Sequence, residues 1–176
     1  MTEPRRSTGP TRSREQRPTV AVDLRIARDG TWYHDGAPIR RAALVKLFAD
    51  ALVRGADGAI WLETPAERAR VAVDDAPFVA VDVDTEGQGE QQTVIFRTNV
   101  GDRVAADAQH PIRVAFGEGG EPAPYVLVRA GLEALIGRAA YYRLVAMGVE
   151  RRQGDRVMLG VWSGGQFFSL GETGDA

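Results

Sequence analysis

The first half of the chain alternates apolar and polar residues, and this pattern predicts a series of short strands. Leu24 and Ile26 flank the polar Arg25, and an Asp-Gly pair at residues 29–30 follows before Trp32. Both residues of a tight hairpin turn must tolerate positive φ, so Asp-Gly between β-forming residues predicts a hairpin. The same period of two marks further strands at residues 60–62, 69–73 and 79–83.

Residues 40–54 interrupt this alternation and predict a helix. Their apolar positions recur with a period of about 3.6 residues, which places them on one helical face. We expect that face to be buried. Its members are Leu44, Leu47, Phe48 and Ala51.

The polar segment 85–92 breaks the pattern, which then restarts in the second half of the chain. A second helix is predicted over residues 131–147, with Gly148 as its C-terminal residue. Its apolar stripe, also expected to be buried, contains Leu132, Leu135, Ile136 and Ala139. Strands are predicted at 93–97, 112–116 and 125–129, and a final hairpin turns at residues 163–165.

Both halves thus have the order strands, one helix, antiparallel pair. We predict an α+β fold of two similar subdomains, residues 20–84 and 91–173, each an antiparallel sheet packed by one long helix. The repeated order suggests duplication of one unit. The alternative is that this order is a generic α+β arrangement with no duplication behind it.

Charge is distributed unevenly along the chain. Five arginines against two glutamates give residues 1–19 a net charge of +3, and the total of −2 leaves −5 on residues 20–176. We predict that residues 1–19 form a disordered, Arg-rich tail, either a solvated leader or a segment that contacts nucleic acid or anionic surfaces. The acidic body disfavours nucleic acid as a partner of the whole protein.

Composition excludes several other functions. There is no cysteine, which excludes disulfides, thiol nucleophiles and thiolate metal sites and fits a cytoplasmic protein. No apolar run is long enough to cross a bilayer, so we expect no membrane partner.

Candidate catalytic and metal-binding residues are few. His34 and His110 are the only histidines, and neither has the spacing to another ligand that metal sites use. Ser163 lacks the frame of a nucleophile. We therefore predict no catalytic residue and no metal site, and the sequence leaves any cofactor unknown. Thr64 and Glu67 match a capping box around one short helical turn, although a ligand-binding role is the alternative.

Arginines near aromatic residues are the best candidates for a binding site. Arg129 precedes the second predicted helix, and Arg138 lies one turn before Tyr142 within it. A guanidinium beside a ring can hold a phosphate or carboxylate while the ring stacks on a base. It can equally form a buried ion pair between sheet and helix. Arg41 is the matching candidate at the start of the first helix.

The chain resembles a bacterial family of domains of unknown function, number 1285 in that naming series. The resemblance covers about residues 21–173 and rests on a combination of residues rather than on one motif. The matching residues are Trp32, His34, Gly36, Ile39, Arg41, Leu44, Phe48, Gly58, Leu62, Thr64, Pro65, Glu67, Val71, Val73, Asp75, Ala76, Pro77, Phe78, Phe96, Thr98, Asn99, Arg129, Leu132, Ala134, Leu135, Arg138, Tyr141 and Tyr142.

The resemblance implies a duplicated α+β unit whose C-terminal part is superficially similar to a pleckstrin-homology fold. It also implies a cleft between the halves for a nucleotide-like ligand and a role in signalling, with no activity established. We therefore expect a cytoplasmic module that binds a nucleotide-like or other anionic small molecule. The site prediction is Arg41, Asn99, Arg129, Arg138 and Tyr142.

Two other functions stay open at this point. One is a structural or protein-interaction module with no small-molecule ligand. The other is an enzyme of unknown class, in which Asp75 and Glu67 would be the only plausible general bases.

Overall fold

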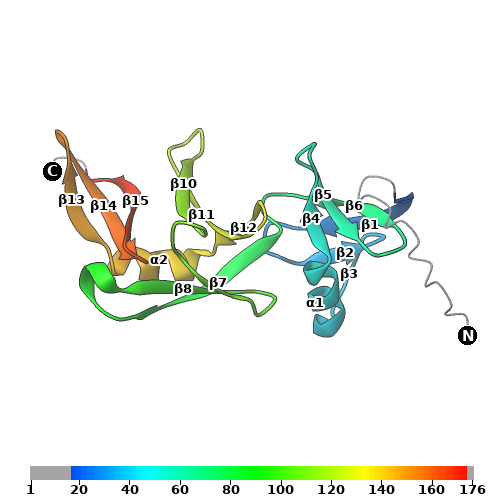
Figure 1. Ribbon diagram of the computed structural model, residues 1–176. Helices are drawn as coiled ribbons and strands as arrows, with labels where there is room; N and C mark the ends of the chain where they lie inside the picture. The colour runs from blue at the N-terminus through cyan, green and yellow to red at the C-terminus, as the bar shows by residue number, and fades with distance from the viewer. Residues whose placement is uncertain (1–16, 174–176) are drawn as a thin grey trace, which may run out of the picture.

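The computed structural model describes residues 17–173, which form three β-sheets and two short α-helices (Figure 1). Most of the predicted tail, residues 1–16, lies outside the described residues. Its last three residues are described, and the first strand, β1, already begins at Thr19. No helix in this part of the chain is long and apolar enough to cross a membrane.

The first sheet, sheet A, contains the six strands of the N-terminal half. The order across it is β3 (Ala37–Pro38), β2 (Trp32–His34), β1 (Thr19–Ile26), β6 (Arg68–Val73), β5 (Ile60–Glu63) and β4 (Leu52–Arg54). The predicted turn at 29–30 is confirmed, because Gly30 has a φ of +87° and β1 pairs antiparallel with β2. β1 and β6, however, pair in parallel.

The second sheet, sheet B, also has six strands and forms the middle of the molecule. The order is β10 (Ile112–Phe116), β11 (Pro122–Arg129), β12 (Leu132–Ile136), β7 (Phe78–Glu86), β8 (Thr93–Thr98) and β9 (Arg103–Ala105). β7 and β12 form its one parallel pair. A 3₁₀ turn, η2 (Gly89–Gln91), connects β7 and β8.

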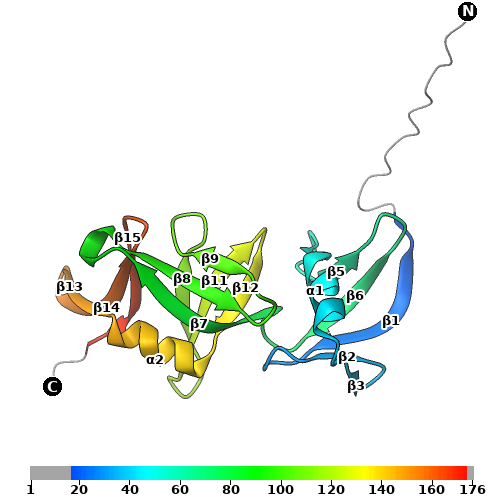
Figure 2. The ribbon, with the colours of Figure 1, turned by 90° about the horizontal axis from the view of Figure 1, so that it is seen from below.

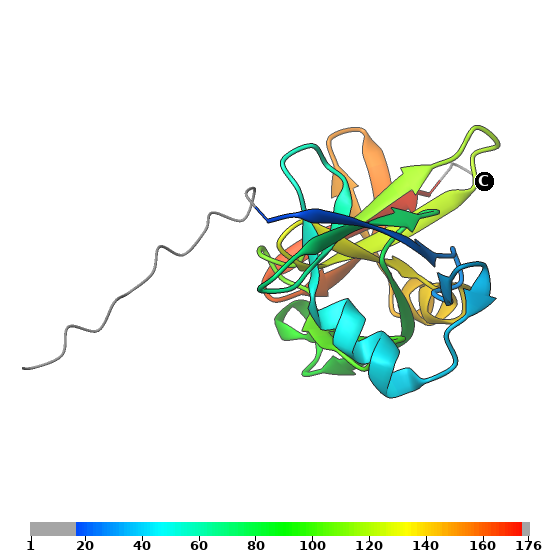
Figure 3. The ribbon, with the colours of Figure 1, turned by 90° about the vertical axis from the view of Figure 1, so that its right-hand side faces the viewer.

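A third sheet, sheet C, follows as an antiparallel meander. It consists of β13 (Val149–Gln153), β14 (Arg156–Ser163) and β15 (Gln166–Glu172). The three sheets follow one another along a long axis, with sheet A and sheet C at opposite ends (Figures 1 and 2). In the view along this axis, helix α1 crosses below β1 (Figure 3).

The predicted fold class is wrong, because the protein is mostly β. Strands account for 52% of residues 17–173 and helical segments for 13%. Each of the two larger sheets contains a parallel pair, and neither is an antiparallel sheet covered by one long helix. The two helices, α1 (Ala42–Asp50) and α2 (Arg138–Ala146), have nine residues each.

The second helix was overpredicted because strong helix formers occupy a strand. Residues 132–136 read Leu-Glu-Ala-Leu-Ile, which has high helix propensity. In the structure they form β12, since pairing with both β11 and β7 outweighs that propensity. Ala130 and Gly131, both at positive φ, turn the chain from β11 into β12, and α2 begins only at Arg138.

The expected burial of the first helical face is only partly correct. Leu44 and Phe48 are half-buried, whereas Leu47 is 63% exposed. The helix is shorter than predicted, because residues 52–54 leave it to form β4. In the second half, Leu132 and Ile136 are buried as expected, but they point inward from a strand.

One continuous core runs through all three sheets. Its largest fully buried side chains include Trp32 from sheet A, Phe78 and Phe96 from sheet B and Leu144 from α2. α2 packs against β7 and β14, so it joins sheet B to sheet C. The three sheets that follow one another along the long axis therefore share one core.

Candidate functional site

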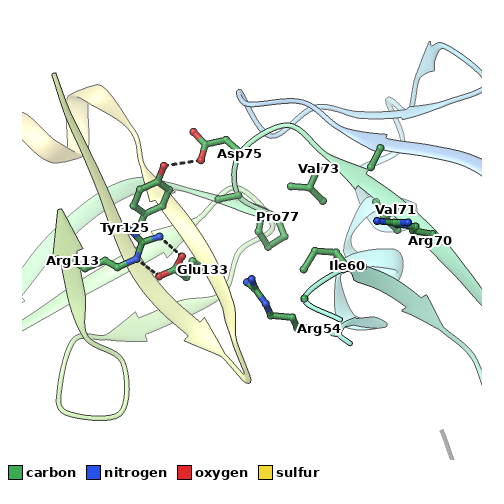
Figure 4. Close-up of a pocket in the computed structure, with 14 residues that line it drawn as sticks. Arg54, Ile60, Arg70, Val71, Val73, Asp75, Pro77, Arg113, Tyr125 and Glu133 are labelled. Carbon is green, nitrogen blue, oxygen red and sulfur yellow. Dashed lines mark hydrogen bonds and ion pairs between the residues drawn. The ribbon is translucent and has the colours of Figure 1, made fainter. Parts of the chain in front are cut away.

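A pocket of about 550 Å³ lies where sheet A meets sheet B (Figure 4). The linker between β6 and β7 passes along it and contributes Asp75, Ala76 and Pro77. Proline fixes φ and restricts the residue before it, which favours an extended connection at this point. The pocket is therefore built around the segment that joins the two halves.

The sheet B wall carries a network of charged and aromatic groups. Arg113 donates two hydrogen bonds of 2.6 Å to the carboxylate of Glu133, and its guanidinium lies 4.2 Å from the ring centroid of Tyr125. The Tyr125 hydroxyl donates to Asp75 Oδ1 at 2.7 Å. These residues come together because Arg113 and Tyr125 are register partners in the β10–β11 ladder (Figure 4).

Local electrostatics fix the protonation of this network. The hydrogen bond with Glu133 raises the pKa of Arg113, so the guanidinium stays charged. Burial, followed by the bond to Asp75, raises the pKa of Tyr125. Its hydroxyl is consequently a proton donor at neutral pH rather than a phenolate.

The sheet A wall supplies two further guanidiniums. Arg54 donates to the carbonyl oxygen of Gly131 at 3.1 Å, and Arg70 is exposed at the pocket. Within residues 17–173 neither forms an ion pair. The carboxylates that line the pocket are already paired, since Glu133 binds Arg113 and Asp75 lies 3.1 Å from Arg28 Nε. The pocket therefore carries positive charge that no lining carboxylate neutralises.

Two predicted site residues connect the halves elsewhere on the junction. Arg129 donates to Asp102 Oδ2 at 3.2 Å and to the Ala49 carbonyl at 2.5 Å, and it lies 5.1 Å from the ring centroid of Phe78. Arg129 thus forms an ion pair, but one that is partly exposed and joins β11 to the β8–β9 turn, rather than the buried pair between sheet and helix given as the alternative. Asp102 Oδ1 also accepts a hydrogen bond of 2.7 Å from Lys46 Nζ of α1, and this bond is a second contact between the halves.

Asn99 is the second predicted site residue that forms a hydrogen bond between the two halves. Its Oδ1 accepts from the Val79 amide at 3.0 Å, and its Nδ2 donates to the Gly30 carbonyl at 3.3 Å. A Cβ on Gly30 would come within 2.6 Å of Nδ2, so the glycine allows this close approach. Asn99 therefore holds the β1–β2 turn of sheet A against sheet B.

The other predicted residues lie on the helices. Arg138 Nε donates to the Tyr142 hydroxyl at 3.1 Å, an i, i+4 pair on the exposed side of α2. Arg41 is the exposed residue preceding α1, and its side chain does not cap the helix. None of the five predicted site residues lines the pocket of Figure 4.

Sequence reasoning missed Arg54, Arg70 and Arg113 as pocket residues. Each sits in a strand, where an arginine ordinarily marks a solvent-facing position. They line one pocket because of the strand order within each sheet and because sheet A lies next to sheet B. The available signal was the segment Asp75-Ala76-Pro77, which lies between the strands predicted at 69–73 and 79–83.

Other sequence candidates have local roles. Thr64 Oγ1 accepts from the Glu67 amide at 3.1 Å and donates to the Glu67 carbonyl at 3.0 Å. This bond is the one predicted for a capping box, but it closes a turn and no helix follows. His110 Nδ1 lies 3.0 Å from Asp107 Oδ1. Residues 17–173 contain no cluster of three potential metal ligands.

In a comparison with known protein families, the two parts of the chain match two domains of the same family. The domain of unknown function described as DUF1285, N-terminal domain, matches residues 13–76, and the DUF1285 C-terminal domain matches residues 77–170. None of the curated proteins compared matches the chain.

Two solved structures are similar to the chain over most of their length. A DUF1285 family protein from Silicibacter pomeroyi DSS-3 is 47% identical with a TM-score of 0.81, covering 95% of this chain and 90% of that one. A DUF1285 family protein from Shewanella baltica OS155 is 28% identical with a TM-score of 0.54, covering 70% of this chain and 90% of that one. With both domains matched over nearly the whole described chain, the protein belongs to the DUF1285 family.

Proposed function

We propose that this protein is a cytoplasmic, non-enzymatic module that binds an anionic, nucleotide-like small molecule in the pocket between sheets A and B. The observation that carries the proposal is the pair of guanidiniums on the sheet A wall, Arg54 and Arg70, neither of which forms an ion pair within residues 17–173. The pocket has the volume usual for a small-molecule site, and such sites have a few converging polar groups.

The chemistry of the walls suits a phosphorylated ligand. Guanidiniums bind phosphate through charge-assisted, often bidentate hydrogen bonds. Arg113 is already held by Glu133 and lies against Tyr125, so it offers a fixed planar surface on which a base can stack. The sheet A wall would bind the charged part and the sheet B wall the planar part.

A signalling role follows from the position of the pocket. Its lining comes from both halves and from the linker that joins them. A ligand that contacts both halves changes the free energy of their relative arrangement, which is how binding is transmitted to another surface.

The test is a thermal-shift screen of nucleotides and of inorganic phosphate, because a ligand specific to the folded state raises Tm by mass action. For any hit, Arg70→Gln is expected to weaken binding tenfold or more, which corresponds to loss of about 1.4 kcal/mol. Arg152→Gln, at an exposed position of β13, is the matched control and should bind as the wild type does.

Arg54→Gln provides a second test of the same wall. Unchanged affinity in both folded variants would remove the pocket from consideration. Parallel measurements on Arg129→Gln and Arg138→Gln then decide whether the ligand binds at the residues predicted from the sequence. The absence of any hit would favour a structural or protein-interaction module.

A further inference from the structure

A second pocket, of about 370 Å³, lies within the N-terminal half between sheet A and α1. It is separate from the junction pocket and shares none of its lining residues. Its lining is mainly aliphatic and aromatic, with contributions from four strands and the helix. The apolar members are Val20, Val22, Leu24, Ile39, Leu44, Phe48, Leu62 and Ala69.

The pocket exists because α1 covers only part of the sheet. Nine helical residues span about 14 Å, which is less than a six-stranded sheet is wide. β1 adds to the opening through a shift in its register with β6. Val20 pairs with Ala69 and Leu24 with Val71, so the segment between them contains two extra residues on the β1 side.

The two ends of the pocket differ in their exposure to solvent. Leu24 is buried at the sheet, and Phe48 packs against the fully buried Trp32 with ring centroids 6.0 Å apart. Val22, in contrast, is 36% exposed. The pocket therefore has a closed apolar interior and an open mouth.

Three polar residues also line the pocket: His34, Thr64 and Glu67. The Thr64 hydroxyl is occupied by two hydrogen bonds to the Glu67 backbone, and His34 Nε2 lies 3.6 Å from Asp35 Oδ2. The Glu67 carboxylate has no hydrogen bond or ion pair with any residue in the described chain. No arginine or lysine lines this pocket.

We propose that this pocket binds a small ligand with an apolar body and a cationic head, such as an alkyl- or aralkylamine. The apolar interior would bury the body, and Glu67 would pair with the head at the mouth. The chain's own N-terminal segment is a poor occupant, because residues 1–16 contain no aliphatic or aromatic residue except Met1. The proposal is independent of anion binding at the junction.

The head-group preference can be tested by competition against a neutral fluorescent probe, N-phenyl-1-naphthylamine. Octylamine, octanol and octanoate share one chain length and differ in charge. Octylamine is expected to displace the probe at about tenfold lower concentration than octanol, and octanoate at a higher concentration than either. Equal concentrations for all three would overturn the proposed role of Glu67.

Glu67→Gln keeps the backbone bonds to Thr64 and removes only the charge. We expect this variant to bind octylamine and octanol equally, with octanol affinity unchanged. Glu118→Gln, in the exposed turn between β10 and β11, is the control and should keep the amine preference. Retention of the preference in Glu67→Gln would contradict the proposal.

Val22→Trp tests the location by filling the mouth. Because Val22 is partly exposed, the larger side chain can be accommodated, and probe affinity should fall tenfold or more. Val81→Trp on β7 is the matched control, since Val81 is also a partly exposed strand valine. Probe binding that survives Val22→Trp in a folded protein places the apolar site elsewhere. Arg70→Gln should leave octylamine binding unchanged, which separates this pocket from the junction site.

Discussion

Truncation of Phe78 to alanine is expected to lower the free energy of unfolding by about 3–5 kcal/mol. Phe78 is fully buried and opens β7, where it pairs with Ala134 of β12. The Arg129 guanidinium lies 5.1 Å from its ring centroid, so the ring also supports the ion pair between Arg129 and Asp102. The variant leaves a cavity at the point where the two halves meet.

Urea unfolding measures this loss of stability as a lower midpoint concentration of urea, with no change in the m-value, the slope of the free energy of unfolding against urea concentration. Phe116→Ala is the control, because Phe116 is largely exposed on β10 and its truncation should change stability by no more than about 0.5 kcal/mol. Similar effects for the two variants would mean that Phe78 is not part of the core.

The second large effect is expected for Ser163→Ala, at about 2–4 kcal/mol. The Ser163 hydroxyl is fully buried, accepts from the Val94 amide at 2.8 Å and donates to the Ala106 carbonyl at 2.6 Å. Alanine leaves a buried donor and a buried acceptor without partners. The serine that we excluded as a nucleophile thus holds the end of β14 against sheet B.

Ser169→Ala on β15 is the matched control, because Ser169 is only half-buried and its side chain forms no hydrogen bond to another described residue. Chemical unfolding followed by tryptophan fluorescence reports the difference, since Trp162 lies next to the substituted position. Equal stability of the two variants would show that the buried hydroxyl contributes no net stabilisation.

Short-range patterns in the sequence were reliable where the local chain determines the structure. The strand predicted at 112–116 has the bounds of β10, and the Asp-Gly turn at 29–30 forms between β1 and β2. The parallel pair β1–β6 could not be predicted in the same way. It joins residues 47 to 49 positions apart, and no local period specifies the partner of a strand.

The candidate site was less predictable for the same reason. The sequence showed that arginines lie near aromatic residues, which is correct for Arg138 and Tyr142 and for Arg129 and Phe78. It could not show that Arg54 and Arg70 face a pocket, because both positions depend on how sheet A packs against sheet B. Arg129 and Asn99 instead connect the halves by donating to the carbonyl oxygens of Ala49 and Gly30.

The grouping of the strands also determines the order in which the protein can fold during synthesis. Every strand of sheet A, including the parallel pair, lies within residues 19–73, whereas sheet B begins at Phe78. The N-terminal sheet can therefore form on the ribosome before any residue of sheet B has emerged, as domains that fold in sequence do. Sheet B cannot complete its own parallel pair until β12 has been synthesised. Asn99 and Arg129 therefore form their hydrogen bonds to a sheet A that can already have folded.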